Sequence, residues 1–175
     1  FWIVVSIIGM PDGADAVPEK SIPAKAAVVM DASGNVLYAK FPNAKLAPAS
    51  TVKLVTAMVV LDLLKPDQTV VISPKASRTK TIQPGLCPDE EMTVSDLLHL
   101  ALMKSINSAA VALAEASAGS EDAFVALMNM KAAEIGATTT LFANASGLPK
   151  GTQYSTASDL AFIMRSAVHY PLIRE

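Results

Sequence analysis

Two short apolar runs near the start of the chain flank a polar turn. Residues 26–31 and 36–40 are rich in Ala, Val and Leu, and the four residues between them, 32–35, include Ser, Gly and Asn. Apolar runs of this length that are separated by turn-forming residues are typical of a β-hairpin. We therefore predict two antiparallel strands that begin a sheet.

The next segment is apolar on nearly every face. From Ser50 to about Leu64 the spacing is helical, Asp62 is the only acidic residue, and Lys65-Pro66 closes the segment. A helix without a polar face belongs in the interior of a protein, because each of its sides needs an apolar neighbour. We predict a buried, central helix here.

The remainder of the chain alternates helical patterns with short β-prone runs. Hydroxyl residues stand where helices should begin, and Gly or Pro follows the last turn of each helix after residue 107, as capping and termination require. The predicted elements are a strand at 70–72, helices at 93–103, 108–118 and 121–135, a strand at 138–142 and a helix at 156–169.

Composition and charge narrow the class of protein. A length of 175 residues with 51% apolar residues is sufficient for the core of one domain and excludes a disordered chain. The formal net charge is -2, and no run of Lys or Arg forms a basic stripe, which excludes nucleic acid as a partner. The single cysteine, Cys87, has no partner for an internal disulfide, so the fold relies on its core.

The first residues suggest export. An apolar block, too short to cross a bilayer, is followed by Pro11, Gly13 and the small-x-small sequence Ala14-Asp15-Ala16. This order is typical of a secretory signal peptide. We interpret residues 1–16 as the remnant of a signal peptide and residues 17–175 as the folded part. A buried N-terminal strand is the alternative, and the sequence leaves both open.

Ser50 and Lys53 stand three residues apart at the start of the apolar helix. Residues at this spacing share one helix face, so the serine oxygen and the lysine nitrogen can form a hydrogen bond. Apolar surroundings disfavour the charged ammonium, and a neutral amine can take a proton from the serine. Free N–H groups at the helix start would stabilise an oxyanion. The pair predicts an acyl-transfer nucleophile with its base; a capping serine beside a lysine that reaches solvent is the alternative.

A second polar pair, Ser105 and Asn107, lies between two predicted helices. Side chains two residues apart in an extended turn project to the same side, while Ile106 points away. Ser105 would pass a proton to or from a leaving group, and Asn107 would hold a substrate amide or the Lys53 amine. The alternative is that both residues cap the adjacent helix ends.

Other candidate groups are assigned structural roles. His99 and His169 suggest a histidine base, but core packing for the first and a favourable position at a helix end for the second suit them better. The acids at 89–91 lie in a Pro-rich loop, which is typical of a solvated stretch rather than a cation site. Several methionines fall at apolar helical positions and are interpreted as core residues: Met58, Met103, Met128, Met130 and Met164.

Several ordered blocks resemble the low-molecular-mass penicillin-binding proteins, which are the serine D-alanyl-D-alanine carboxypeptidases and endopeptidases of peptidase family S11. The similarity runs from about residue 25 to the end of the chain. The first two blocks have the form of established penicillin-binding motifs. The blocks are Ser50-Thr51-Val52-Lys53, Ser105-Ile106-Asn107, Asn144-Ala145-Ser146-Gly147-Leu148-Pro149 and Tyr154-Ser155-Thr156-Ala157-Ser158-Asp159-Leu160.

The resemblance implies an α/β (α+β) fold of the β-lactamase/transpeptidase type, in which an antiparallel sheet is flanked by helices and a helical cluster. Residues 17–175 would be the N-terminal part of a DD-peptidase catalytic domain. The implied reaction is hydrolysis of the D-Ala-D-Ala end of peptidoglycan stem peptides through an acyl-enzyme on Ser50. Lys53 would be its base, Ser105 would transfer protons and Asn107 would bind substrate.

The resemblance also carries expectations about partners and location. No metal or organic cofactor is implied, and β-lactam antibiotics are expected to acylate Ser50 as substrate mimics. The implied location is the periplasm or another extracytoplasmic face of the cell envelope, and membrane association of a longer parent protein stays open.

Two features depart from the family pattern. Ile106 stands where the family more often has a small or polar residue, and no Lys-Thr-Gly follows Asp159. We therefore expect a chain that is truncated before the third motif, which binds the substrate carboxylate, and that is nearly inert by itself. Two alternatives stay open: a D-alanyl-D-alanine endopeptidase that cleaves cross-links, and a non-catalytic module that binds β-lactams or peptidoglycan.

Overall fold

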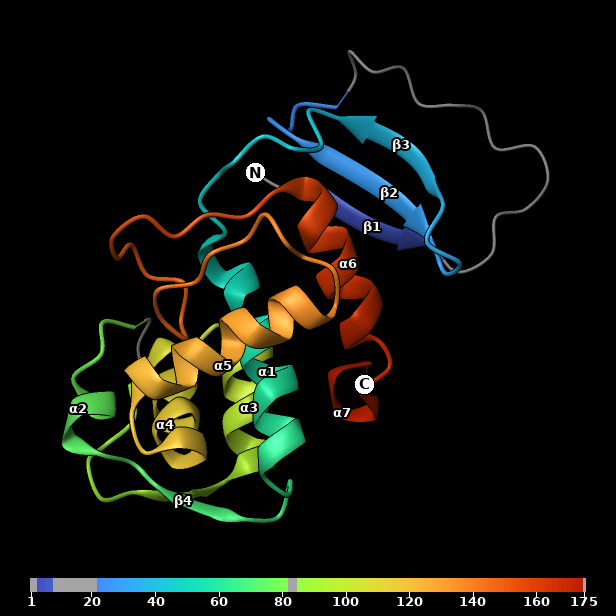
Figure 1. Ribbon diagram of the computed structural model, residues 1–175. Helices are drawn as coiled ribbons and strands as arrows, with labels where there is room; N and C mark the ends of the chain where they lie inside the picture. The colour runs from blue at the N-terminus through green and yellow to red at the C-terminus, as the bar shows by residue number, and fades with distance from the viewer. Residues whose placement is uncertain (1–2, 8–21, 82–84, 175) are drawn as a thin grey trace.

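The chain folds into a small sheet beside a larger group of helices, in a computed structural model that describes residues 3–7, 22–81 and 85–174 (Figure 1). Helix α6 (Ala157–Ala167) joins these two parts, because it contacts strands β1 (Ile3–Ile7) and β2 (Ala27–Asp31) as well as helix α1 (Val52–Leu63). The predicted fold class, a mixed α/β protein with an antiparallel hairpin and flanking helices, is confirmed.

The sheet contains β1 (Ile3–Ile7), β2 (Ala27–Asp31) and β3 (Val36–Lys40), in the order β1-β2-β3. β2 and β3 are antiparallel, which confirms the predicted hairpin, and β1 pairs with β2 in parallel. Of the segment 1–16, the structure describes only the backbone of β1; the rest lies outside the described residues, and the signal peptide stays a prediction.

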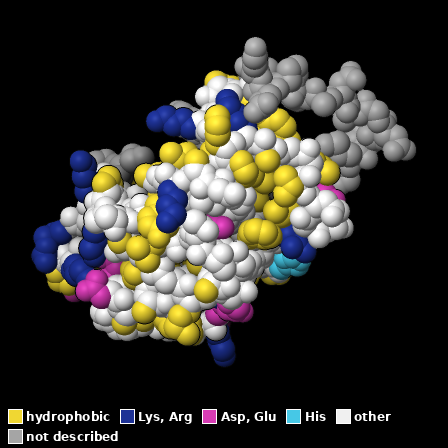
Figure 2. All heavy atoms as spheres, turned by 45° about the horizontal axis from the view of Figure 1, so that its top comes forward, with side chains coloured by type: hydrophobic (Ala, Val, Ile, Leu, Met, Phe, Trp, Pro, Cys, Tyr) yellow, Lys and Arg dark blue, Asp and Glu magenta, His cyan; other side chains and the backbone are white. Residues whose placement is uncertain are grey.

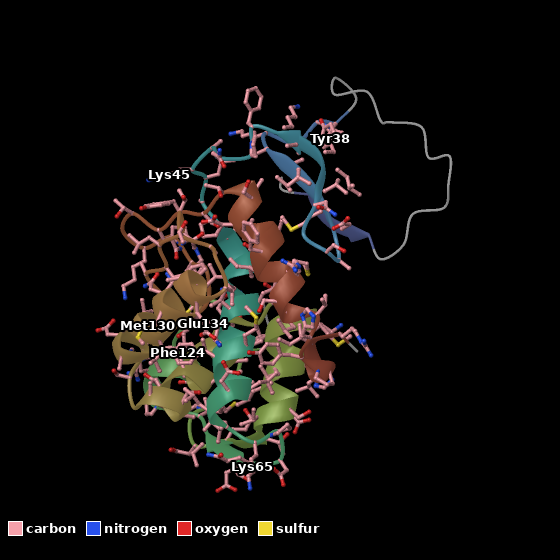
Figure 3. The ribbon with its side chains drawn as sticks, turned by 45° about the vertical axis from the view of Figure 1, so that its right-hand side comes forward. Tyr38, Lys45, Lys65, Phe124, Met130 and Glu134 are labelled. Carbon is pink, nitrogen blue, oxygen red and sulfur yellow. The ribbon has the colours of Figure 1, made fainter. Side chains whose placement is uncertain are left out.

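Helix α1 (Val52–Leu63) runs through the middle of the helical group, as the ribbons in Figures 1 and 3 show. It follows directly on the 3₁₀ helix η2 (Ala49–Thr51). It packs against α6 and against three further helices, α3 (Val94–Met103), α4 (Asn107–Ala118) and α5 (Glu121–Glu134). Eight of its residues are buried, on all of its faces. The prediction of a central apolar helix is therefore confirmed.

The other elements surround α1. β4 and β5 form a short antiparallel ladder at the end of the molecule remote from the three-stranded sheet. The bounds are β4 (Thr69–Val71), α2 (Pro74–Ser77), β5 (Glu91–Thr93), α3 (Val94–Met103), α4 (Asn107–Ala118), α5 (Glu121–Glu134) and α7 (Pro171–Arg174). Only β4 among the strands of this part was predicted; β5, α2 and α7 are too short to leave a periodic pattern.

The predicted caps account for the helix starts. The side-chain hydroxyls of Thr93, Ser120 and Thr156 each accept a hydrogen bond from the backbone N–H three residues later, at 3.1, 3.2 and 3.1 Å. Each of these contacts satisfies an N–H group that has no partner within its helix. Gly119, at φ 75°, ends α4 in the left-handed conformation that glycine adopts most easily.

The strand predicted at 138–142 is wrong. Side chains bind this segment instead of a neighbouring strand: Asp159 accepts two hydrogen bonds from it, at 2.8 and 2.6 Å, and Asn129 accepts a third from a backbone N–H at 2.9 Å. Only one isolated bridge, between Leu141 and Tyr154, pairs backbone with backbone. The β-branched residues that suggested a strand therefore serve a side-chain network.

Methionine packing was predicted only in part. Met58 and Met128 are fully buried, but Met103 is 75% and Met130 is 67% exposed, so their assignment to the core is wrong. Figure 3 labels Met130 together with Phe124 of the same helix α5, and Phe124 is fully buried. Helices that are apolar on several sides give no polar face by which inner and outer methionines can be distinguished.

The surface agrees with the balanced charge of the sequence. Figure 2 shows basic and acidic side chains mixed on the face that it displays, among hydrophobic ones, without a broad basic stripe. Within the described ranges, no helix combines the length and the hydrophobicity that crossing a membrane requires.

Candidate active site

Ser50 lies in η2, immediately before α1, and its side chain is exposed. The residue before it, Ala49, has a φ of 48°, which is unusual for a residue with a Cβ atom. Thr51 fixes the same turn, because its hydroxyl donates to the Pro48 carbonyl at 2.6 Å. The sequence therefore presents the Ser50 hydroxyl to solvent from a tightly bonded turn at the start of the central helix.

Lys53 lies beneath Ser50 in the first turn of α1 and is only 2% exposed. Four oxygen atoms from three segments of the chain surround its amine. The distances from Lys53 Nζ are 3.3 Å to Ser50 Oγ, 3.3 Å to Ser105 Oγ, 2.7 Å to Asn107 Oδ1 and 2.6 Å to the Ser146 carbonyl. The alternative in which this lysine reaches bulk solvent is wrong.

Burial changes the acidity of this amine. It lowers the pKa of Lys53 from an ordinary value of 10.5 to about 8, because the charged ammonium loses its water shell. No carboxylate is among its four partners, so no negative charge restores the protonated form. At neutral pH a useful fraction of Lys53 can therefore accept a proton from a neighbouring hydroxyl.

Ser105 and Asn107 face this amine from the connection between α3 and α4. Ser105 has a φ of 56°, and its hydroxyl donates to Ser50 Oγ at 2.9 Å. Ile106 between them is 5% exposed and points into the core, as predicted. No side chain caps the start of α4, so the interpretation of Ser105 and Asn107 as helix caps is wrong.

The loop before β5 supports Asn107. The backbone N–H of Asn107 donates to Thr81 Oγ1 at 2.9 Å, and the side-chain Nδ2 of Asn107 donates to the Lys80 carbonyl at 2.8 Å. Because Nδ2 is occupied in this way, Oδ1 is the end that faces the Lys53 amine. Asn107 is therefore oriented as an acceptor for the lysine.

Four of the sequence-predicted residues thus come together, but the sequence did not indicate the fifth group, the Ser146 carbonyl. A backbone carbonyl leaves no pattern of residue types. The only available signal was the turn-forming sequence Asn144-Ala145-Ser146-Gly147, which indicates a turn but not what the turn contacts.

The other titratable groups are not in this site. His99 and His169 are both exposed. His99 Nδ1 lies 2.7 Å from the Ser95 carbonyl of its own helix, and His169 Nδ1, just after the end of α6, lies 2.9 Å from the Arg165 carbonyl of that helix. Core packing for His99 was therefore a wrong prediction. Cys87 is a free, exposed cysteine. In the part of the chain that the structure describes, no three His, Cys, Asp or Glu side chains gather in a way that could hold a metal ion.

The chain is similar to known D-alanyl-D-alanine carboxypeptidases and endopeptidases. The model of the peptidase S11 family, described as D-alanyl-D-alanine carboxypeptidase, matches residues 13–175. The D-alanyl-D-alanine carboxypeptidase DacF of Bacillus subtilis is 39% identical over 86% of this chain and 40% of its own length. A D-alanyl-D-alanine endopeptidase of Escherichia coli is 35% identical over 89% of this chain and 51% of its own length.

A solved structure is similar to this chain in both sequence and fold. The crystal structure of a D-alanyl-D-alanine carboxypeptidase from Mycobacterium tuberculosis superposes with a TM-score of 0.85 at 38% identity, over 94% of this chain and 62% of that one. The chain therefore spans between two fifths and about three fifths of the length of these relatives. A family match over nearly the whole of the chain, supported by the same fold and by these relatives, shows that this protein belongs to the peptidase S11 family.

Proposed function

We propose that this chain carries the nucleophile and the base of a serine-type D-Ala-D-Ala carboxypeptidase that acts on peptidoglycan stem peptides. The observation that supports this most directly is the buried Lys53 amine, with a pKa lowered to about 8, in contact with the hydroxyls of Ser50 and Ser105. A buried amine that is neutral can take the proton of the serine hydroxyl, which is the role of the histidine base in other serine peptidases.

In the proposed reaction Ser50 attacks the carbonyl carbon of the penultimate D-Ala while its hydroxyl proton passes to Lys53 Nζ. The tetrahedral intermediate collapses as the C–N bond breaks, and the leaving D-Ala takes up a proton that Lys53 delivers through Ser105. Water then hydrolyses the acyl-enzyme by the reverse proton path. Asn107 holds the amine and a substrate amide, and no metal or organic cofactor takes part.

The proposal extends to a longer protein. In the family pattern a Lys-Thr-Gly strand binds the substrate carboxylate and supplies the second N–H group that stabilises the oxyanion, and these 175 residues contain no such sequence. Loss of one oxyanion donor alone costs roughly a hundredfold or more in rate. We therefore propose that this chain by itself is nearly inert, and that a protein which combines it with a Lys-Thr-Gly strand is active.

Partners and location follow from the same chemistry. We propose that β-lactams acylate Ser50, since a strained cyclic amide can take the place of the D-Ala-D-Ala bond. We also propose that the enzyme is exported and works at the extracytoplasmic face of the envelope, where stem peptides are found. Release of residues 1–16 during export can be checked by N-terminal sequencing of the secreted form.

Labelling with a fluorescent penicillin tests the central proposal. A longer protein that contains this chain and a Lys-Thr-Gly strand should be labelled stoichiometrically, and Ser50→Ala should abolish the label. Label that persists in Ser50→Ala would refute the assignment of the nucleophile. Rapid stoichiometric labelling of the 175-residue chain would contradict only its predicted inertness.

A second candidate function is supported by the relatives themselves. The E. coli relative that is named an endopeptidase is 35% identical, close to the 39% of the carboxypeptidase from B. subtilis. Digestion of cross-linked and uncross-linked muropeptides separates the two activities by their products. Release of free D-Ala indicates the carboxypeptidase, whereas loss of cross-linked dimers without D-Ala release indicates the endopeptidase. If the protein is labelled but turns over neither substrate, it is a non-catalytic binding module.

A further inference from the structure

We infer that the turn at residues 144–148 is a positioning element for Ser50 and Lys53, and that Asn144 and Gly147 are the residues on which its shape depends. What the positioned pair does rests on the proposed function. The positions of Ser50 and Lys53 do not depend on the proposed function, because the effect of the turn on them can be measured on the folded chain without any reaction.

The Asn144 side chain organises the turn from inside. It is 4% exposed, and its Oδ1 accepts hydrogen bonds from the backbone N–H groups of Ser146 and Gly147, at 3.2 and 2.6 Å. Its Nδ2 donates to the Leu148 carbonyl at 2.7 Å. Both ends of one buried amide are therefore used to close the turn, which is the arrangement that gives asparagine its role in turns.

The turn is attached to two helices. Ala145 is the point of attachment: its carbonyl accepts from Thr56 Oγ1 at 2.7 Å, and its N–H donates to Glu121 Oε1 at 3.1 Å. Thr56 lies on α1, one turn after Lys53, and Glu121 is the first residue of α5. Figure 1 shows the connection between α5 and α6 passing the start of α1. A shift of the turn relative to the lysine would therefore break contacts with both helices.

The carbonyl next to this attachment orients the amine. A neutral lysine has two N–H donors and one lone pair. The Ser146 carbonyl at 2.6 Å and Asn107 Oδ1 at 2.7 Å can only accept hydrogen bonds, and they are the two shortest contacts of Lys53 Nζ. They take both N–H groups, so the lone pair is left for the two hydroxyls at 3.3 Å. The Ser146 carbonyl thus directs the basic electron pair toward the nucleophile.

Gly147 lies directly against the residue that precedes the nucleophile. A Cβ atom at Gly147 would stand 1.9 Å from the Ala49 carbonyl oxygen, 2.5 Å from the Ala49 carbonyl carbon and 3.1 Å from the Ser50 nitrogen. Its φ of 83° also favours glycine. Because Ala49 itself has a positive φ, this contact supports the unusual backbone that presents Ser50.

The turn also separates the amine from solvent. Asn144 and Ser146 line an open pocket of about 230 Å³. Truncation of Asn144 would leave the Ser146 carbonyl without its support and open a path for water from this pocket to the Lys53 amine. Because burial is the cause of the lowered Lys53 pKa, such a change should move that pKa back toward 10.5.

NMR on the 175-residue chain tests the inference without catalysis. The Lys53 Cε–Hε signal is followed against pH in wild type, Asn144→Ala, Gly147→Ala and the control Gly136→Ala. Gly136 has a φ of 88°, and a Cβ atom there would meet nothing within 4 Å, so the control has the same backbone strain without the collision. We expect the titration midpoint to rise in the first two variants and to stay at the wild-type value in Gly136→Ala, with circular dichroism confirming that each is folded.

Acylation kinetics provide the second measurement, in the longer protein that is labelled by penicillin. Above the midpoint, where the amine is neutral, the plateau rate of Gly147→Ala should fall by roughly a hundredfold, the size expected for a misplaced reacting group, and that of Gly136→Ala should not. Asn144→Asp keeps the accepting oxygen and should retain more of the plateau rate than Asn144→Ala, which supplies a test if Gly147→Ala does not fold.

The two measurements separate this inference from the proposed function. If the midpoint rises in the variants but wild type is not labelled at Ser50, the positioning role holds and the proposed function fails. If wild type is labelled but neither the midpoint nor the plateau rate differs between the turn variants and Gly136→Ala, the positioning role is refuted and the proposed function stands.

Discussion

Acylation of Ser50 by a β-lactam should accelerate about tenfold per pH unit up to about pH 8 and then level off, because Lys53 must be neutral to act as a base. The structural cause is the burial of the Lys53 amine, which lowers its pKa to about 8. Only the unprotonated fraction of the enzyme can remove the Ser50 proton, so the rate should follow that fraction.

The size of the effect on the acylation rate follows from the pKa values of a buried and of an exposed lysine. With a pKa of about 8, about one tenth of Lys53 is neutral at pH 7, whereas an exposed lysine with a pKa of 10.5 would be neutral in only about 0.03% of molecules. Burial therefore raises the amount of active base about 300-fold at pH 7, which corresponds to about 3 kcal/mol. Lys53→Arg should abolish the gain, since a guanidinium stays charged at every pH in this range.

The assay is stopped-flow acylation with a fluorescent penicillin between pH 6 and pH 10, in the longer protein that carries a Lys-Thr-Gly strand. Ser50→Ala provides the background rate at each pH. A rate that does not change between pH 6 and pH 9, or one that is still rising tenfold per pH unit at pH 10, would refute a buried neutral amine as the base.

The burial of the Lys53 amine also makes the unfolding free energy of the protein depend on pH. The folded state binds the Lys53 proton less tightly than the unfolded state does, so stability is lowest below about pH 8 and rises as the pH approaches 10.5. Compared with Lys53→Met, wild type should therefore gain about 3 kcal/mol in unfolding free energy between pH 7 and pH 10.5. Urea denaturation of both proteins at the two pH values measures the difference, and a difference that is constant with pH would contradict it.

Three further predictions concern the scaffold. Asp159→Ala should lower the free energy of unfolding by about 1 to 3 kcal/mol, because the Thr139 N–H and the Thr140 hydroxyl lose a buried acceptor. Thermal unfolding measures this loss, and an unchanged unfolding temperature would count against the hydrogen-bond network. Met58→Ala, at a fully buried position of α1, should lower the free energy of unfolding by about 2 to 5 kcal/mol, far more than truncation of the exposed Met130. Urea denaturation of the two variants measures the difference. Lys131 donates to Asp62 at 2.8 Å, and this contact raises the pKa of Lys131 above its ordinary value of 10.5. Lys131→Met should therefore lower the free energy of unfolding by about 1 kcal/mol at pH 7, and urea denaturation should show this difference begin to shrink only above about pH 10.5, as the pH rises toward the raised pKa.

The helical part of the fold was predictable because its signals are local. Hydroxyl caps such as Thr93 and Ser120 mark helix starts through contacts with N–H groups only three residues away, and Gly119 marks an end in the same way. Where long-range contacts decide the structure, sequence patterns failed. The β-branched run at 138–142 has strand-like residues, but hydrogen bonds to the distant Asp159 keep it out of any sheet.

The candidate site was predictable to the extent that it consists of side chains at helical or extended spacing. Ser50 and Lys53 are brought together by one turn of backbone, and Ser105 and Asn107 by another. Spacing did not require the two pairs to meet. The residue types indicated a contact between Asn107 and the Lys53 amine only as one of two roles, and the resemblance to known motifs favoured a shared site. The Ser146 carbonyl and the support from Thr81 come from backbone and loop geometry, which residue types do not specify.

The four oxygens around Lys53 come from positions as far as 93 residues away along the chain. An unfolded or newly synthesised chain cannot assemble this shell, and its lysine is then an ordinary solvated ammonium beside an unreactive alcohol. Under the proposed function, acylation of Ser50 therefore requires that the helices have already packed, because only then is the Lys53 amine buried beside the serine.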